Sequence, residues 1–333
     1  MNKSIAKGMT SPFARGQVYL VEDTETQVFR GEEYVVHARY YECKDTGEKF
    51  TSEEQDEQMF RELYNQYRVR HGIPFPDEIK AIRERYKLSC QQMSKIVGFG
   101  QNQWGQYESG KIPSESNGKS IAAIRSRDGM LAILEASRNE FDENTYNKIR
   151  NNVLCAPDNG SHNNRNVYFY GSTKRGLYNG YSEMNADKLQ NMVQLIVSME
   201  KDGVSKTKLN KEMFYADFLC YNRHGYSISG LMYRAIQYGA VPEHYETVYD
   251  HVEGLQRNIV GGDMEYELLT CDTPDTSALN NEELKVIQDV MAFLAGKTCS
   301  EVVKLNHEED GWLKYKDSHS FIPYNEAFSL KAI

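Results

Sequence analysis

Residues 88–110 read LSCQQMSKIVGFGQNQWGQYESG, which has the spacing of two short helices joined by a tight turn. Ser94 lies four residues before Gly98, where two crossing helices would approach closely, and a glycine tolerates the backbone of the turn. Phe99 and Trp104 have the size to fill the seam between the helices. The stretch therefore predicts a helix-turn-helix.

The outer face of the second predicted helix, over 101–109, carries amide side chains. They are Gln101, Asn102, Gln103 and Gln106. Amide groups suit bidentate hydrogen bonding to adenine edges in the major groove of DNA. The local charge agrees, because residues 77–127 hold nine Lys and Arg against five Asp and Glu, in a chain of net charge −9. The alternative is that these amides are solvent-exposed side chains of the helix and bind nothing.

The Asn-Gln-Trp-Gly-Gln-Tyr-Glu-Ser-Gly block over 102–110 resembles the helix-turn-helix of phage repressors. It is similar, more closely, to the C-terminal DNA-binding domain of MqsA-type antitoxins. By that resemblance Asn102 and Gln106 fall where the family reads bases, while Lys111 and Lys119 fall where phosphates are met. The resemblance thus implies operator DNA as a partner.

The same resemblance implies an ion pair inside this region. The family pairs a buried Arg of its first helix with the Glu before the Gly, and the matching residues here are Arg83 and Glu108. We interpret the pair as structural rather than functional. Short helices with short connections over 56–152 predict a compact bundle around it.

Near-alternating runs rich in Val, Tyr and Thr predict a small antiparallel sheet over 16–55. MqsA-type chains begin with a zinc module of two C-x-x-C pairs. The segment 40–50 looks like the second pair with its second cysteine replaced by Thr46, and the first pair is missing. Because zinc takes about four ligands, Cys43 alone cannot hold it. We therefore expect a degenerate zinc ribbon without metal, or else an unrelated small sheet.

Turn-forming, weakly apolar residues over 153–182 predict a linker, and a mainly helical domain is expected over 183–333. One buried helix face is predicted by Leu189, Met192, Val193, Ile196 and Met199. Two late helices are expected to open with capping boxes at Asn280 with Glu283 and at Thr298 with Glu301. The fold class predicted for the chain is mainly α, with a small N-terminal sheet.

Several motifs in this last region occur in the order found in the Panacea domain, also called the SocA-like antitoxin domain. They are residues 206–218, 225–230, 238–245, 306–312 and 322–327. Ala240 departs from the family, which more often has Pro before Val-Pro. The resemblance implies a helical antitoxin domain that binds and neutralises a protein toxin encoded by a neighbouring gene. It does not identify the toxin.

The aromatic and turn residues of these motifs are candidates for the toxin contact. They are Tyr215, Tyr238, Gly239, Pro242, Tyr245, His307 and Trp312. Core packing is the alternative for each of them. Residues 181–333 hold 24 Asp and Glu against 14 Lys and Arg, and an acidic surface would complement a toxin with a basic site. Ordinary solubilising charge explains the same count.

Catalytic motifs are weak in this sequence. His307 precedes an acidic run and His319 follows, but the H-E-x-x-H spacing of zinc enzymes is absent. Neither a nucleophile elbow nor a phosphate-binding loop is present. We therefore expect no enzymatic activity and no cofactor.

The remaining composition bears on the compartment. The six cysteines are dispersed without a C-x-x-C pair, as in reduced thiols of a cytoplasmic protein. They are Cys43, Cys90, Cys155, Cys220, Cys271 and Cys299. No run of about 18 apolar residues and no apolar N-terminal stretch is found, so neither a membrane span nor secretion is expected.

The leading hypothesis is an antitoxin with two activities. The C-terminal domain would sequester a toxin, and the helix-turn-helix would repress the shared operon as a homodimer on a palindrome. One alternative is a proteolytic adaptor that delivers the toxin to a protease, as is known within SocA-like proteins. Another is a ligand-sensing transcriptional regulator without a toxin partner.

Overall fold

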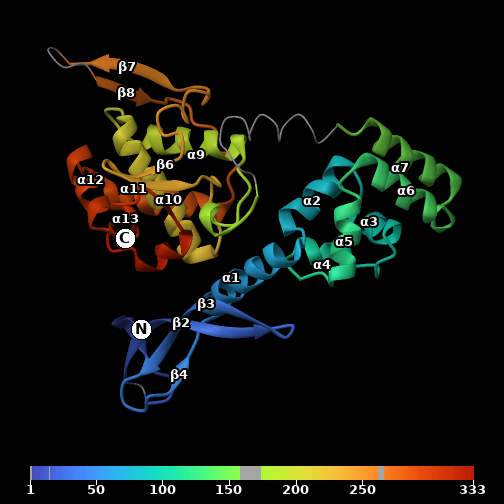
Figure 1. Cartoon of the computed structure of the whole chain (residues 1–333), viewed down its shortest axis with the longest axis horizontal. Helices are drawn as coiled ribbons and strands as arrows, with labels where there is room; N and C mark the ends of the chain where they lie inside the picture. Colours follow the sequence, from blue (N-terminus) through green and yellow to red (C-terminus); the bar gives the residue numbers. More distant parts are fainter. Residues whose placement is uncertain (1, 15, 158–173, 262–265) are drawn as a thin grey trace. The chain divides into compact units, whose positions relative to one another are not determined.

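The computed structural model describes residues 2–14, 16–157, 174–261 and 266–333 (Figure 1). It divides into two compact units, one formed by 1–62 with 165–333 and the other by 63–164. Each unit is described by itself below. Most of the predicted linker, residues 158–173, lies outside the described residues. No helix of the described part is long and apolar enough to span a bilayer.

The first unit contains the N-terminal sheet, whose strands follow one another in sequence order. They are β1 (Asn2–Thr10), β2 (Gln17–Phe29), β3 (Glu32–Cys43) and β4 (Lys49–Phe50). β2 and β3 pair in continuous antiparallel register and are joined by Arg30 and Gly31, both with positive φ, as two-residue hairpin turns require. The sheet predicted over 16–55 is confirmed from β2 onward, but it starts earlier, since β1 adds an irregularly paired edge strand.

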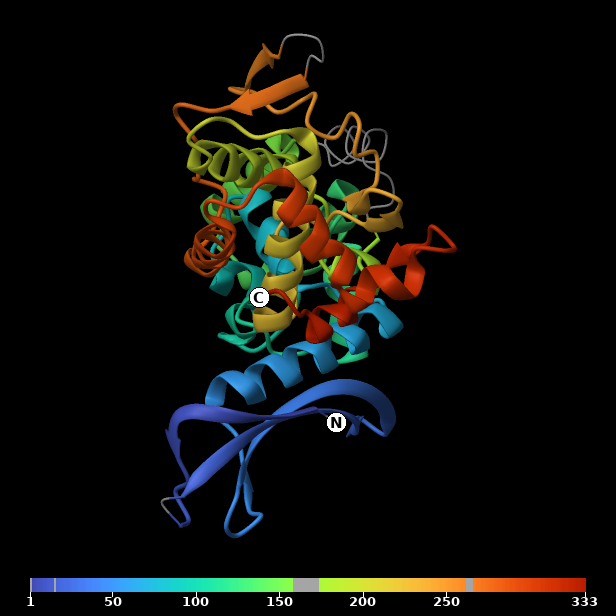
Figure 2. The ribbon, with the colours of Figure 1, turned by 90° about the vertical axis from the view of Figure 1, so that its left-hand side faces the viewer.

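Helix α1 (Glu53–His71) begins directly after the sheet, and its residues from 63 on belong to the second unit. Figure 2 shows the start of α1 beside the β2–β3 hairpin, where the Glu62 carboxylate accepts from the His37 N–H at 2.8 Å. The hairpin also contacts the C-terminal part of the first unit. His37 stacks on Phe328 with ring centroids 3.9 Å apart, and Arg39 donates to the Asn222 side chain at 2.8 Å. The sheet therefore covers part of the C-terminal domain.

The C-terminal part of this unit is built around α10 (Lys206–His224), in which every residue from Lys208 to Tyr221 is buried. Its other helices are α9 (Ala186–Met199), α11 (Asn281–Leu294), α12 (Cys299–Glu308) and α13 (Asp310–Tyr315), with short 3₁₀ turns η2 (Leu177–Asn179) and η3 (Tyr324–Ser329). The predicted α9 face is buried except for Met199, the last helical residue, which is 40% exposed. Both predicted capping boxes are confirmed.

Two small sheets that the sequence did not predict complete the domain. One is three-stranded in the order β6 (Gly239–Pro242), β5 (Tyr233–Ile236), β9 (Phe321–Ile322). The other is a hairpin of β7 (Gln256–Val260) and β8 (Tyr266–Thr270). Mainly α remains the correct description, but the C-terminal domain is mixed.

The second unit is a bundle of short helices. They are α2 (Pro76–Arg85), α3 (Cys90–Ile96), α4 (Gln103–Glu108), α5 (Glu115–Ala123), α6 (Arg127–Ala136) and α7 (Glu143–Cys155), with the short η1 (Arg138–Glu140). Its core includes Tyr86, Met93, Trp104 and Ile121, which are fully buried. Ser89 caps α3 by accepting from the Gln92 N–H. The predicted bundle is confirmed, although α4 begins two residues later than expected.

Candidate functional site

The connection between α3 and α4 is fixed by Ser94 and by a glycine turn. Gly98 has φ of 72°, a left-handed conformation that a glycine adopts without strain. The Phe99 N–H donates to the Ser94 carbonyl at 2.7 Å, and the Trp104 N–H donates to the Ser94 hydroxyl at 3.0 Å. Ser94 is thus both small enough for the helices to approach and a hydrogen-bond acceptor that sets their relative position.

The predicted pair of Arg83 and Glu108 is confirmed and ties α2 to α4. Arg83 donates through Nε and Nη2 to the two carboxylate oxygens of Glu108, at 2.6 and 3.0 Å. Trp104 Nε1 donates to the same carboxylate at 2.7 Å. The Glu108 carboxylate raises the pKa of Arg83, as a forked, charge-assisted pair should. The pair is therefore part of the framework that holds α4.

Replacing this carboxylate by an amide tests its contribution. Glu108→Gln is expected to lower the free energy of unfolding of the second unit by roughly 1–3 kcal/mol, because the amide cannot accept both Arg83 donors. Urea unfolding followed by Trp104 fluorescence measures this, in a Trp312→Phe background that silences the other tryptophan. Glu84→Gln is the matched control, since exposed Glu84 also lies near Arg83. Equal effects of the two substitutions would contradict the framework role.

An open hollow of about 580 Å³ lies over the α3–α4 connection. Its lining residues are Cys90, Gln91, Gln101, Asn102, Gly105, Gln106, Ser109 and Lys111. Four of the six predicted DNA-contacting residues are thus brought together. The other lining residues, Cys90, Gln91, Gly105 and Ser109, were not predicted from the sequence.

The polar groups of this hollow suit a nucleotide. Gln101, Asn102 and Gln106 are exposed amides, each with donors and an acceptor. The Lys111 ammonium donates to the side-chain amide oxygen Oε1 of Gln106 at 3.0 Å, so a positive charge lies beside the amides. Such a set can contact base edges and a phosphate at once. Lys119 is exposed on α5 but does not line the hollow.

Gln103 differs from the other predicted base-reading amides. Its carbonyl oxygen accepts from the Gly100 N–H at 3.1 Å, and its amide nitrogen donates to the Tyr107 hydroxyl at 2.5 Å. Both ends of the side chain are thus engaged at the start of α4, and Gln103 does not line the hollow. Gln103 therefore stabilises the start of α4.

Cys43, at the end of β3, is fully covered and lies where the resemblance places a zinc ligand. Hydrogen bonds from the Ser11 and Thr46 hydroxyls lower its pKa to about 7. One thiol with two hydroxyls does not make the four-ligand set that zinc takes. Among the described residues no group of three or more His, Cys, Asp or Glu is arranged to hold a metal ion. Thr46 thus acts as a donor to the thiol.

Removing the larger of these two contributions should raise the Cys43 pKa. Ser11→Ala is expected to move it from about 7 upward. A depressed thiol pKa stabilises the folded sheet above the ordinary cysteine pKa, and this contribution is lost as pH falls through about 7. Thiolate ultraviolet absorbance during a pH titration measures the change, with Cys43→Ser as blank and exposed Ser4→Ala as control. An unchanged midpoint in Ser11→Ala would refute the assignment.

Asp217, in the middle of α10, organises the C-terminal domain. Its buried carboxylate accepts from the Ile228 and Ser229 N–H groups, both at 2.9 Å, from the Ser229 hydroxyl and from the Tyr233 hydroxyl at 2.7 Å. Burial raises its pKa to about 6. Asp217 thereby anchors the whole loop between α10 and β5. Sequence reasoning included it in a motif without giving it a role.

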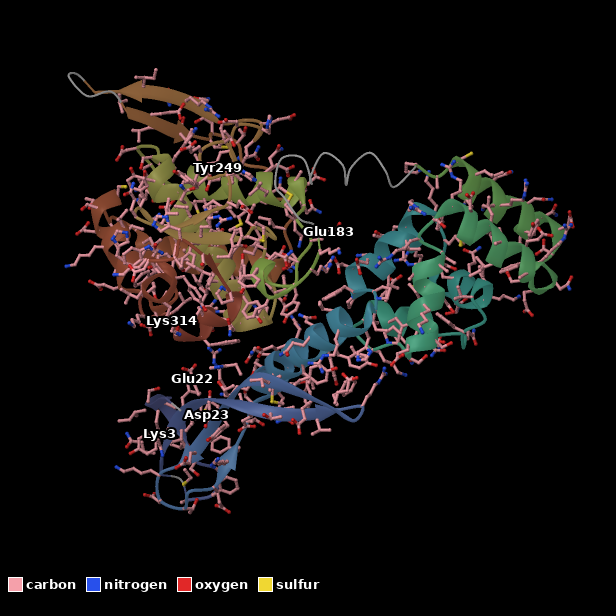
Figure 3. All side chains as sticks on the ribbon, viewed as in Figure 1. Lys3, Glu22, Asp23, Glu183, Tyr249 and Lys314 are labelled. Atoms are coloured by element: carbon pink, nitrogen blue, oxygen red, sulfur yellow. The ribbon has the colours of Figure 1, made fainter. Side chains whose placement is uncertain are left out.

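A second buried polar side chain of α10, Asn210, also makes a hydrogen bond. The Tyr249 hydroxyl, buried at the position labelled in Figure 3, donates to the Asn210 side chain at 2.7 Å. It connects the segment after β6 to α10. The two contacts satisfy two of the polar side chains, Asp217 and Asn210, in a helix that is buried over most of its length.

Three of the predicted toxin-contacting residues are buried in the domain, as the core-packing alternative has it. Tyr215 is fully buried and donates to Glu309 at 3.1 Å. Gly239 and Pro242 are buried in β6. A side chain on Gly239 would meet the Asn306 oxygen at 2.5 Å, so this glycine is needed for packing. The alternative of core packing holds for all three.

The other four predicted residues reach the surface to different extents. Tyr238, in the β5–β6 turn, is 55% exposed, and Tyr245 is half-buried. His307 and Trp312 are half-buried and stack with centroids 4.1 Å apart. Trp312 Nε1 also donates to the Ile236 carbonyl at 2.8 Å, so much of this ring stabilises the domain.

Residues 209–313 match the family model described as antitoxin SocA-like, Panacea domain. The match extends from α10 to α13 and includes Asp217, Tyr238 and Trp312. The resemblance stated for the C-terminal domain is thus confirmed over this segment, and a toxin is the kind of partner it suggests. The match reaches neither the N-terminal sheet nor the helical second unit. No curated protein and no solved structure matches the chain.

Proposed function

We propose that this chain is the antitoxin of a type II toxin–antitoxin pair and acts in the cytoplasm without catalysis. Its C-terminal domain binds and neutralises a protein toxin encoded by a neighbouring gene. Its α3–α4 region binds operator DNA, as a homodimer, and represses the operon. The observation that carries the proposal is the antitoxin-domain match over 209–313, which coincides with a folded domain around α10.

Charge supports the toxin-binding half of the proposal. Residues 181–333 hold ten more acidic than basic residues, from 24 against 14. Toxins that act on RNA or nucleotides use basic sites, and an acidic surface attracts such a partner and speeds its association. The exposed aromatic Tyr238 offers an apolar contact on the same domain.

The DNA-binding half rests on the hollow over α3 and α4. Gln101, Asn102 and Gln106 supply amides for base edges, and Lys111 supplies a cation for phosphate. The surplus of four positive charges over 77–127, nine against five, attracts the phosphate backbone in a chain that is acidic overall.

Co-expression with the neighbouring gene tests the proposed neutralisation. The full chain is expected to restore growth that the neighbouring gene's product arrests. Because β3 covers Phe328 and Asn222, the fragment 181–333 is expected to neutralise less well than the full chain. Growth arrest that the full chain leaves unrelieved would refute the proposal. An unchanged toxin half-life supports sequestration, whereas a shortened one identifies a proteolytic adaptor.

A further inference from the structure

The β7–β8 hairpin is attached to its domain on one side only. Leu269 of β8 is buried and exchanges both backbone hydrogen bonds with Val204, at 2.8 and 2.9 Å. On the other side, no strand among the described residues pairs with the outer edge of β7. Figure 1 shows β7 beside β8 alone. The first four of its five residues are exposed, and the Ile259 side chain is 71% exposed. An unprotected edge with an exposed apolar residue is uncommon in a soluble domain.

The pairing shows which backbone groups this edge offers. Leu269 directs its N–H and C=O toward Val204, hence away from β7. Arg257 lies opposite Leu269, and in antiparallel pairs both members of such a position point their backbone groups outward. Ile259 lies two residues after Arg257, so its backbone N–H and C=O groups also point outward. The outer edge of β7 therefore presents the N–H and C=O groups of Arg257 and Ile259.

The segment that contains the hairpin is acidic in sequence, and Lys206 of α10 pairs with two of its carboxylates, Asp250 and Glu267. Residues 243–275 contain nine Asp and Glu and a single basic residue, Arg257. That residue is already paired, since Asp250 accepts from it at 2.8 Å. This segment alone accounts for eight of the ten surplus negative charges of the C-terminal domain, from nine minus one. A basic chain approaching β7 is therefore attracted, and an acidic one repelled.

We infer that the outer edge of β7 binds an extended, basic segment of the partner protein by strand addition. The N–H and C=O groups of Arg257 and Ile259 pair with the backbone of that segment, and Ile259 supplies an apolar contact. Backbone pairing gives affinity, while the acidic surroundings select the charge of the added strand. The inference rests on the proposed function in taking the toxin as this partner.

Two substitutions of Ile259 distinguish the contribution of its backbone N–H to partner binding from the contribution of its side chain. Ile259→Pro removes an outward N–H and leaves the β7–β8 hydrogen bonds in place, because Ile259 does not bond to β8. Ile259→Thr keeps that N–H and the strand propensity but loses the apolar side chain. The probe is the purified product of the neighbouring gene, titrated against the full chain. Hydrogen exchange of the Leu268 amide reports whether the hairpin remains intact.

Ile259→Pro is expected to weaken binding about tenfold or more, and Ile259→Thr by less. In the unmodified chain, the partner should slow hydrogen exchange at Arg257 and Ile259. Unchanged affinity in Ile259→Pro, with unprotected Arg257 and Ile259 amides, would overturn the strand-addition inference alone. Absence of any binding to the full chain refutes the proposed function and this inference with it. Self-association that Ile259→Pro abolishes would assign the edge to a second copy instead.

Discussion

Asp217→Ala is expected to destabilise the C-terminal domain by roughly 3–5 kcal/mol. The change leaves four donors without an acceptor in a fully buried place, namely two backbone N–H groups and two hydroxyls. Each such orphaned donor costs about 1–3 kcal/mol, although relaxation of the loop recovers part of the sum. Hydrogen exchange along α10 during urea unfolding measures the loss.

Asp217→Asn is the conservative substitution with which the loss of stability in Asp217→Ala is compared. The amide oxygen still accepts from the Ile228 and Ser229 N–H groups, and the Ser229 and Tyr233 hydroxyls can turn to accept from its nitrogen. The loss should therefore be much smaller than for alanine. Asp202→Ala, at an exposed position, is the control and should leave stability unchanged. Similar losses for alanine at 217 and at 202 would show that Asp217 does not anchor the loop.

The raised pKa of Asp217 makes the stability of the C-terminal domain depend on pH. Burial raises the pKa to about 6 in the folded chain, so the folded state disfavours the charged carboxylate. The domain is therefore expected to lose stability as pH rises from about 4 through about 6. Asp217→Asn should remove this part of the pH dependence.

Replacing Gln101, Asn102 and Gln106 together by alanine is expected to weaken operator binding about 100-fold or more. Each bidentate amide–adenine contact contributes about 1–3 kcal/mol, and two of them suffice for this loss. Fold stability should be unaffected, because all three side chains are exposed. A band shift on the chain's own promoter at fixed salt measures the affinity.

A matched triple substitution controls for general loss of surface amides. Asn144, Asn147 and Asn151 are exposed on α7, outside the hollow, and their replacement by alanine should leave operator affinity intact. Lys111→Gln should weaken binding to all DNA sequences alike. It should also lower the slope of log affinity against log salt concentration by about one. If the 101, 102 and 106 triple bound the operator as tightly as the α7 triple, the assignment of the recognition surface would be wrong.

Helices were the part of the fold most accessible from sequence. Period and capping residues located α3, α9, α11 and α12, because Ser89, Asn280 and Thr298 each cap a helix locally. The strands β5 to β9 were not predicted, since each has only two to five residues. β5 pairs locally with β6 and β7 with β8, but β9 pairs with β5 from far along the chain. Val204 fixes β8, and Phe321 pairs beside Arg234, which no local pattern reveals.

The site was predicted in part for the same reason. The sequence named Gln101, Asn102 and Gln106 from the predicted helix and Lys111 from the family resemblance, and all four line the hollow. Gln103 has the same chemistry, but only the positions of Gly100 and Tyr107 show that its amide is engaged within α4.

Burial was the harder property to predict for the candidate toxin-contacting residues. Tyr215 is an aromatic residue of a Panacea motif, like Tyr238, yet one is buried in α10 and the other exposed in a turn. Tyr215 hydrogen-bonds to Glu309, 94 residues further along the chain, and residue type does not encode such a contact.

Titration of the purified full chain with the purified product of the neighbouring gene is the most direct test of the antitoxin role. We expect a stoichiometric complex of the two proteins that elutes as one species, with the toxin intact and inactive. A neighbouring product that stays free, or remains active when mixed with excess chain, would contradict the proposal that this protein is an antitoxin.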